Sequence, residues 1–398
     1  DLERGETDLV VHSWKDLPIA DRPGTEIAAT LPRADARDVL LLKESSWSRV
    51  VRDRGLRVYS SSPRRSRNLA PFLSDHLPAE IDSVEFSPVR GNVPTRIRKL
   101  VEDPDVDSLV VAKAALDRLL VPVPGAPDDE AERFSETATE LRGRLSGLRW
   151  MVLPLSENPT AAAQGALAIE IRKGRTDLRA LLGRIHSEAT ARTVRREREI
   201  LARYGGGCHQ KIGVSILDRP YGEILFLRGE TDSGEVLDRA DLVRRDSETP
   251  AEIKASEAQP NPASEAWPIE TGDGSAFYSR NPIPIDEEEF RKSIRGKALW
   301  VARGNALPDP LRGIPTSSTI VWAAGTKTWR NLARSGIWVN GSAEGLGEDE
   351  DPGIDVLSGR KVEWLKLTHS PIESLPENRS GIPAFPTYSL VPAPEVPN

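Results

Sequence analysis

The sequence has very little sulfur and few aromatic side chains: its 398 residues include one cysteine, one methionine and 5% aromatic residues. The lone cysteine, Cys208, excludes an internal disulfide framework and any zinc or iron–sulfur site built from several cysteines. This composition is typical of a reducing compartment, so we expect a cytoplasmic protein. No run approaches the ~20 apolar residues that a membrane-spanning helix requires, and we expect no membrane partner.

Several common motifs are also absent. The sequence contains no phosphate-binding Gly-x-x-x-x-Gly-Lys-Ser/Thr loop, no zinc-binding His-Glu-x-x-His and no Gly-x-Ser-x-Gly nucleophile turn. The five histidines are scattered along the chain, so we assign no metal site. A net charge of -7 gives no broad basic surface, and we therefore expect no nucleic-acid partner.

The length predicts two to four domains at ~100 to 200 residues per domain. Residues 246–274 contain four prolines, many Ala, Ser and Glu, and almost no periodic apolar pattern, which is the composition of a linker. Six of the nine tryptophans lie between Trp267 and Trp364, so we expect a separate module after this linker. The first six residues have neither an initiating Met nor a targeting segment, and we expect them to come from the interior of a longer chain.

Short apolar runs alternate with helical patterns before the linker. The runs at 7–11, 38–42 and 108–112 are typical of buried strands, residues 94–102 have helical spacing, and Pro63 is placed to open a helix. Strands that alternate with helices indicate an α/β fold with mostly parallel sheets.

The same alternation continues further along the chain. Residues 129–145 and 177–204 have helical patterns, and 213–217 and 223–228 alternate as two strands joined by a turn. We therefore expect a small additional α/β unit in this region.

Two polar clusters are candidates for anion chemistry. Residues 12–18 (HSWKDLP) place the Asp16 carboxylate beside the Lys15 ammonium at the end of a strand, where open α/β sheets bind ligands; the alternative is a turn with a helix-capping Asp. Residues 60–65 (SSSPRR) combine a helix start with two guanidiniums, which match a carboxylate or phosphate, and residues 90–96 (RGNVPTR) form a second basic helix start. A solvated face is the alternative for these arginines.

The third cluster is the glycine run that precedes the cysteine. Residues 205–208 (GGGC) break a helical pattern, so Cys208 is predicted to lie in a loop. Glycines let a partner approach the sulfur closely, and the alternative is an unreactive loop or buried thiol.

The clusters in this order resemble the hydroxymethylbilane synthase family, also called porphobilinogen deaminase. The most specific pieces are 11–18 (VHSxKDLP), 90–96 (RGNVxTR) and 206–208 (GGC), and the runs at 33–38 (RADARD) and 163–170 (AQGALAIE) also match. The resemblance covers about residues 1–245, without the family's opening strand, and so indicates an N-terminally truncated member.

The resemblance implies an α/β architecture with two periplasmic-binding-protein-like domains, a cleft between them and a small third α/β domain. By position, 1–31 and 158–178 correspond to an incomplete first domain, 32–157 to the second and 179–245 to the third, which carries the cysteine loop. We assign 246–296 to the linker and 297–398 to a C-terminal α/β module.

The resemblance also implies a cofactor and a role for each matching residue. Cys208 would carry a dipyrromethane cofactor through a thioether, and porphobilinogen units would be added to its free end to give the linear tetrapyrrole hydroxymethylbilane. Asp16 matches the catalytic aspartate. The other matching positions are, for the cofactor, Ser13, Lys15, Ser60, Ser62, Arg64 and Arg65, and, for the substrate, Arg90, Arg96 and the hinge residue Gln164. We expect a monomer.

The last predictions concern the tail and the alternative function of the whole chain. Residues 297–345 contain a strand, a Gly-x-x-Thr turn and a helix that loosely resemble uroporphyrinogen-III synthase, which would make the chain a bifunctional fusion; the alternative is an unrelated accessory domain. For the whole chain, the alternative is a non-catalytic binding protein that uses the arginines to hold an anion. Asp16 and Cys208 discriminate, because a pure anion binder needs neither.

Overall fold

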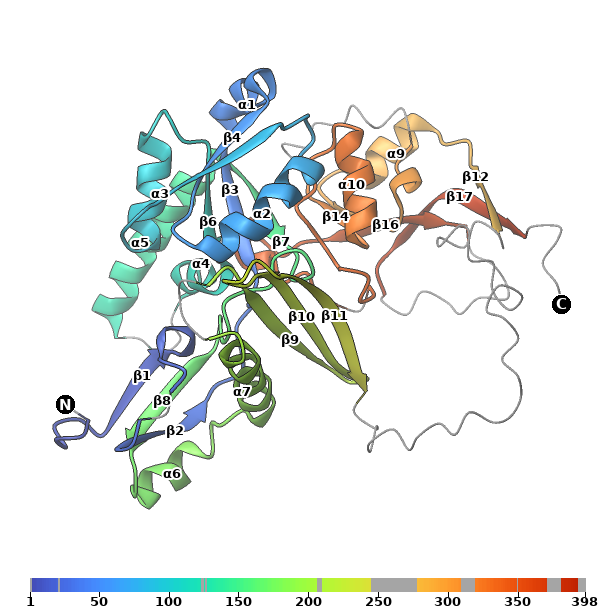
Figure 1. The fold of residues 1–398 in the computed structure, drawn as a ribbon. Coiled ribbons are helices and arrows are strands. Elements are labelled where there is room, and N and C mark those ends of the chain that lie inside the picture. The colour runs from blue at the N-terminus through green and yellow to red at the C-terminus, as the bar shows by residue number, and fades with distance from the viewer. Residues whose placement is uncertain are drawn as a thin grey trace, which may run out of the picture.

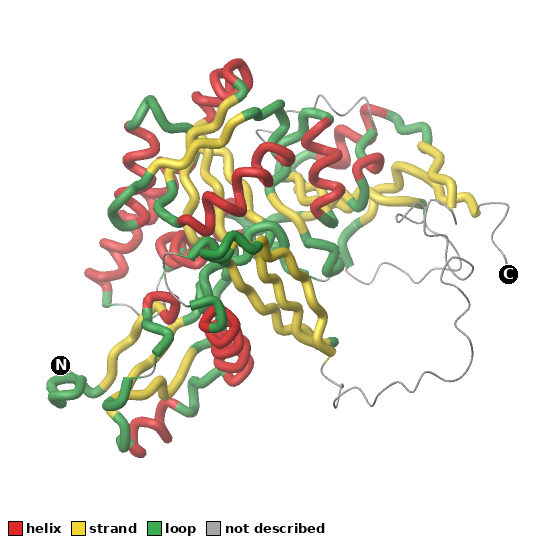
Figure 2. Tube along the Cα trace, in the orientation of Figure 1, coloured by secondary structure: helices red, strands yellow, loops and turns green. Residues whose placement is uncertain are grey.

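The computed structural model describes residues 2–20, 22–122, 125, 127–205, 210–244, 278–308, 319–348, 350–370 and 381–392. Within these residues the chain forms four β-sheets accompanied by helices (Figures 1 and 2). The predicted α/β class is therefore confirmed.

The first sheet contains the N-terminal strands, at the lower left of Figure 1. Its order is β1-β8-β2, with β1 (Leu9–Ser13), β8 (Leu167–Arg172) and β2 (Thr25–Thr30), and both pairings are antiparallel. Two helices follow β8 in the chain, α6 (Thr176–Leu182) and α7 (Glu188–Ala202).

The second sheet has five strands in the order β5-β4-β6-β3-β7. The strands are β3 (Asp38–Lys43), β4 (Gly55–Tyr59), β5 (Ser83–Ser87), β6 (Ser108–Ala112) and β7 (Leu148–Leu153). Its helices are α1 (Trp47–Asp53), α2 (Pro63–His76), α3 (Val93–Glu102), α4 (Lys113–Leu120) and α5 (Asp128–Leu145). Pro63 opens α2 as predicted, because proline lacks the N–H that a first helical turn leaves unpaired.

The third sheet is a three-stranded antiparallel meander. It consists of β9 (Gly213–Arg219), β10 (Gly222–Glu230) and β11 (Val236–Arg244), which run diagonally through the centre of Figure 1. The fourth sheet is formed by the tail, in the order β12-β17-β16-β13-β14-β15. Its strands are β12 (Tyr278–Pro282), β13 (Ala298–Val301), β14 (Val321–Ala323), β15 (Gly341–Ser342), β16 (Trp364–His369) and β17 (Ala384–Pro392), and its helices are α9 (Glu287–Ile294), α10 (Thr326–Arg334) and α11 (Asp355–Ser358).

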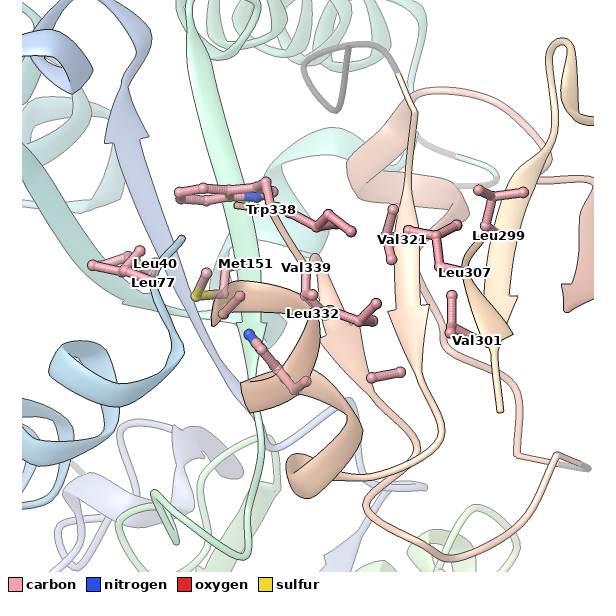
Figure 3. Close-up of a cluster of buried hydrophobic side chains, with 14 of the residues drawn as sticks. Leu40, Leu77, Met151, Leu299, Val301, Leu307, Val321, Leu332, Trp338 and Val339 are labelled. Carbon is pink, nitrogen blue, oxygen red and sulfur yellow. The ribbon is translucent and has the colours of Figure 1, made fainter. Parts of the chain in front are cut away.

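The tail shares its hydrophobic core with the second sheet. Leu40 and Met151 belong to the same buried cluster as Trp338 and Val339, and Figure 3 shows these side chains converging between the two parts. The indole Nε1 of Trp338 also donates to the Trp150 carbonyl, at 3.1 Å. The tail is thus packed on the second sheet, and β12 and α9 are ordered elements within the range that we assigned to the linker.

The prediction of mostly parallel sheets is wrong for the region before residue 245, whereas four of the five strand pairings in the fourth sheet are parallel. The first and third sheets are antiparallel, and β3 runs against its neighbours β6 and β7 in the second. The connections explain why β3 and β7 are antiparallel: the chain enters the second sheet from the first along β3 and leaves it for the first along β7. Two strands that connect the same pair of sheets in this way run in opposite directions. The helix expected over 177–204 is interrupted, because α6 ends at Leu182 and α7 begins at Glu188.

Across the described part of the chain, no helix combines the length and the apolar character that are needed to cross a membrane.

Candidate active site

Two segments of the chain, 31–37 and 154–166, connect the first sheet with the second, and we call them the crossing segments. They lie side by side, since the Ala34 N–H donates to the Gly165 carbonyl at 3.0 Å. Gly165 has a φ of +86°, and a Cβ there would lie 2.5 Å from the Ala34 oxygen. Glycine is therefore required where the segments touch.

The predicted hinge residue Gln164 ties the crossing segments together. Its side chain is buried, and Nε2 donates to the Ala36 carbonyl at 2.6 Å and to Asp38 Oδ1 at 2.8 Å. One amide group thus holds the end of the first crossing segment and the first residue of β3. This position is consistent with the hinge role that the resemblance implies.

Asp38 is the centre of a buried polar network. Its carboxylate has no exposed surface and accepts hydrogen bonds from Arg64 (3.0 Å), Arg65 (2.6 and 3.0 Å), Asn158 (2.9 Å) and Gln164 (2.8 Å). Burial alone would raise the pKa of Asp38, but the charges of Arg65 and Arg64 hold that pKa well below its usual range. The carboxylate is therefore ionised and fixes both guanidiniums.

Arg64 and Arg65 are more deeply buried than a solvated face would require, with side chains 5% and 11% exposed. Arg64 Nη1 also donates to Asn158 Oδ1 at 2.9 Å and to the Pro159 carbonyl at 2.7 Å. Arg64 thus joins α2 to the second crossing segment. Arg65 Nη1 donates to the Val110 carbonyl at 3.2 Å, which fixes α2 on β6.

Lys15 and Asp16 lie where β1 ends in a short 3-10 turn, formed by Trp14–Asp16. The Trp14 side chain is buried. The backbone N–H of Trp14 donates to the Ala166 carbonyl at 3.0 Å, so the turn is attached to the second crossing segment. Ser13 and Lys15 are half-buried, and Asp16 is exposed. Asp16 is thus open to a ligand on a turn that the backbone holds in place.

Lys15 interacts electrostatically with residues of the Asp38 network. Burial, followed by the positive charge of Arg65, lowers the pKa of Lys15, while the Asp16 and Asp38 carboxylates act in the opposite direction. Burial and the charge of Arg65 likewise lower the pKa of Arg96. These electrostatic interactions link Lys15, Arg64, Arg65 and Arg96 as one group of cations.

The remaining predicted residues have varied surroundings. Ser60 is buried and its Oγ accepts from the Ser62 N–H at 3.3 Å, while the Ser62 side chain caps α2 by accepting from the Arg65 N–H. Arg90 is exposed on the loop before α3. Cys208 lies outside the described residues, together with the other residues of 206–209.

Sequence reasoning missed two residues that organise this region. Asn158 bridges Arg64 and Asp38, and nothing in its local sequence marks it apart from its place after a buried strand. Glu197 of α7 is fully buried; it pairs with Arg33 at 2.6 and 3.0 Å and accepts from the N–H groups of Ala163 (2.8 Å) and Ile216 (2.7 Å). The motif at 33–38 contained the signal for Arg33 and Asp38 but not for their partners.

The fold and site define an α/β protein with two sheets joined by paired crossing segments and a group of cations at the junction. A family model described as "Porphobilinogen deaminase, dipyromethane cofactor binding domain" matches residues 1–180. The chain is 34% identical over 220 residues to the porphobilinogen deaminase of Leifsonia xyli, covering 54% of this chain and 56% of the relative. It is 32% identical over 251 residues to the porphobilinogen deaminase of Lachnospira eligens, covering 62% and 73%.

The chain therefore belongs to the porphobilinogen deaminase family, as the motifs predicted. It spans little more than half the length of the Leifsonia relative. Among solved structures, YhfZ from Shigella flexneri aligns with 50% of this chain and 71% of its own, at 15% identity and a TM-score of 0.22, which is too low to inform the fold. The family model is that of the domain that binds the dipyromethane cofactor, in agreement with the predicted cofactor.

Proposed function

We propose that this chain condenses porphobilinogen units into hydroxymethylbilane on a dipyrromethane cofactor held by Cys208. The observation that carries the proposal is the exposed Asp16 carboxylate beside the cation group of Lys15, Arg65 and Arg96. Membership of the porphobilinogen deaminase family supports it.

The cation group fits a cofactor that carries carboxylates. Each pyrrole ring of dipyrromethane has an acetate and a propionate, and forked or ammonium donors bind such groups well. Burial, followed by the Arg65 charge, lowers the pKa of both Lys15 and Arg96, so Arg65 repels each of them in the protein alone. A bound polyanion relieves that repulsion. When bound, the cofactor supplies the pyrrole carbon to which the first substrate unit is joined.

Asp16 is suited to the deamination of porphobilinogen. The aminomethyl group of the substrate reacts as its ammonium form: the C–N bond breaks, the electron pair leaves with ammonia, and the positive charge passes to the methylene-pyrrole. A fixed carboxylate stabilises that charge. The attacking pyrrole then loses the proton of its reacting carbon, and the same carboxylate can accept that proton. Lys15 would hold a cofactor carboxylate and Arg96 a substrate carboxylate, and this would keep the reacting carbons in line.

The test is steady-state consumption of porphobilinogen by Asp16→Ala. We expect turnover to fall by about 10²- to 10³-fold, as for removal of other groups that stabilise a developing charge. The free energy of unfolding should not change, because Asp16 is exposed. The control is Asp8→Ala, which removes another exposed carboxylate next to β1 and should leave turnover intact. Near-normal turnover in Asp16→Ala would contradict the proposal.

The same variant separates catalysis from simple anion binding. In a non-catalytic binder, Asp16 repels the ligand, so Asp16→Ala should bind a polycarboxylate more tightly and the wild-type protein should consume no porphobilinogen. For residues 297–345, the likeness to uroporphyrinogen-III synthase stays a prediction, since the family match ends at residue 180. Chromatography of the uroporphyrin isomers formed from porphobilinogen tests it.

A further inference from the structure

The carboxylate of Glu344 connects the tail to the second crossing segment. Its two oxygens accept hydrogen bonds from consecutive backbone N–H groups, those of Leu155 at 3.0 Å and Ser156 at 2.7 Å. Burial raises the pKa of Glu344. Two-point binding of neighbouring amides fixes both the position and the direction of the backbone that carries them.

The backbone conformation of Glu344 is itself unusual. Its φ is +57°, in the left-handed region that side chains other than glycine rarely adopt. Such a conformation persists only where the surroundings determine it strongly. The next residue is Gly345, which also has a positive φ of +77°. Glycine would adopt this conformation without strain but has no carboxylate. The residue at 344 is therefore strained and supplies a carboxylate.

The amides that Glu344 binds belong to the turn that supports the cation group. The Asn158 N–H donates to the Pro154 carbonyl at 2.9 Å, so 154–158 forms one compact turn. At its far end Asn158 binds Arg64 and Asp38, each at 2.9 Å. The turn is thus held by the tail at its start and by the Asp38 network at its end.

The tail also holds the other crossing segment. Arg37 Nη2 donates to the Pro352 carbonyl at 2.7 Å, and the Arg37 guanidinium lies 5.7 Å from the centre of the Trp322 ring. A cavity of about 370 Å³ is lined by residues of both crossing segments and by Glu344 and Pro352. The cavity leaves part of this junction unfilled, so these polar contacts act there beside the packing of Leu346 against the cluster that contains Leu155.

We propose that Glu344 is a positioning residue for the candidate active site: it holds the 154–158 turn, and through Asn158 it holds Arg64 and Asp38. The tail would then be part of the site's support and not only an attached module. The predicted effect of Glu344 on turnover rests on the proposed function, whereas its predicted effect on the 154–158 turn does not.

The experiment compares Glu344→Gln with Glu348→Gln in the whole protein. Glutamine keeps one acceptor oxygen but cannot accept at both positions. Glu348 is the matched control, because it lies in the same part of the tail and its carboxylate pairs with Lys366 within the tail. Amide hydrogen exchange, followed by mass spectrometry of peptides that cover 154–160, reports on the turn directly.

We expect Glu344→Gln to exchange at least tenfold faster at 154–160 and Glu348→Gln to match the wild type. In the turnover assay, Glu344→Gln should raise the KM for porphobilinogen several-fold with a smaller change in kcat, because the supported residues bind carboxylates. Glu344→Gly, which removes both the carboxylate and the strain, should show the same fast exchange with an unchanged Tm. Unchanged exchange at 154–160 in Glu344→Gln and Glu344→Gly would overturn the inference. If the wild type has no turnover, the proposed function fails and the exchange data alone decide this inference.

Discussion

Asp38 and Arg65 form a two-point ion pair, in which Arg65 Nη2 lies 2.6 Å from Oδ1 and Nε lies 3.0 Å from Oδ2. The pair lies between the first residue of β3 and the first turn of α2. It shows that the arginine cluster at residues 60–65 has a buried counter-charge. The cluster therefore has a structural role in addition to any role in binding, because it holds the remaining cations in place.

Replacement of Asp38 should be strongly destabilising. Asp38→Asn keeps the shape but removes the charge that balances the buried guanidiniums of Arg64 and Arg65, and breaking a buried pair in this way costs about 3–5 kcal/mol. Urea unfolding measures the change. Asp53→Asn is the control: Asp53 pairs with the exposed Arg52 and, at 3.8 Å, with Arg49, and loss of such a surface carboxylate should change stability little. A cost for Asp38→Asn as small as that of the control would contradict the assigned role.

The Asp35–Arg37 pair predicts a pH dependence of stability. Burial by itself would raise the pKa of Asp35. The charge of Arg37, whose Nη2 lies 2.6 Å from the carboxylate, and that of Lys113 outweigh burial and lower the pKa to about 2. An unfolded Asp has a pKa of ~3.9, so the folded state favours the ionised carboxylate by about 2 kcal/mol above that pH. This stabilisation is present above pH ~4 and is lost as the pH falls from ~4 toward ~2.

The difference in unfolding free energy between the wild type and Asp35→Asn measures this effect. It should be at least about 2 kcal/mol at pH 6 and should shrink by roughly half at pH 3. Asp82→Asn, an exposed site, provides the baseline. A difference that stays constant from pH 6 to pH 3 would show that Asp35 is not ionised in the way described.

A close approach between the third sheet and the second crossing segment predicts the effect of Gly213→Ala. A Cβ on Gly213 would lie 2.0 Å from the Pro159 carbonyl oxygen, which is the oxygen that accepts from Arg64. The backbone must therefore shift, at a cost of about 1–3 kcal/mol. Gly143→Ala is the control: it lies in α5 with no atom within 4 Å of the added Cβ, so it should be neutral or stabilising. Equal stabilities of the two variants would rule out the close approach.

The sequence predicted local structure well where a residue's own chemistry sets it. Pro63 begins α2, the apolar run at 108–112 is β6, and the charges of Arg64 and Arg65 act on Lys15 of the segment 12–18. Each of these follows from backbone geometry, apolar patterning or charge, which are properties of a short segment.

Long-range partners could not be predicted in the same way. Asp38 and Asn158 are 120 positions apart, and Glu344 is 188 positions from Ser156. The tryptophans of the tail predicted a core, but only the fold shows that Trp338 packs with Met151 of β7. A hydrophobic pattern shows that a face is buried but does not identify the residues that cover it. The sequence alone therefore does not reveal that the tail packs on the second sheet.

The most direct test of the proposed function is the mass of the intact protein after expression where porphobilinogen is available. We predict one dipyrromethane of added mass, located by peptide mapping at Cys208. We also predict that Cys208→Ser loses the added mass and the turnover together. An unmodified mass in a preparation that consumes porphobilinogen, or full turnover in Cys208→Ser, would contradict the proposed function.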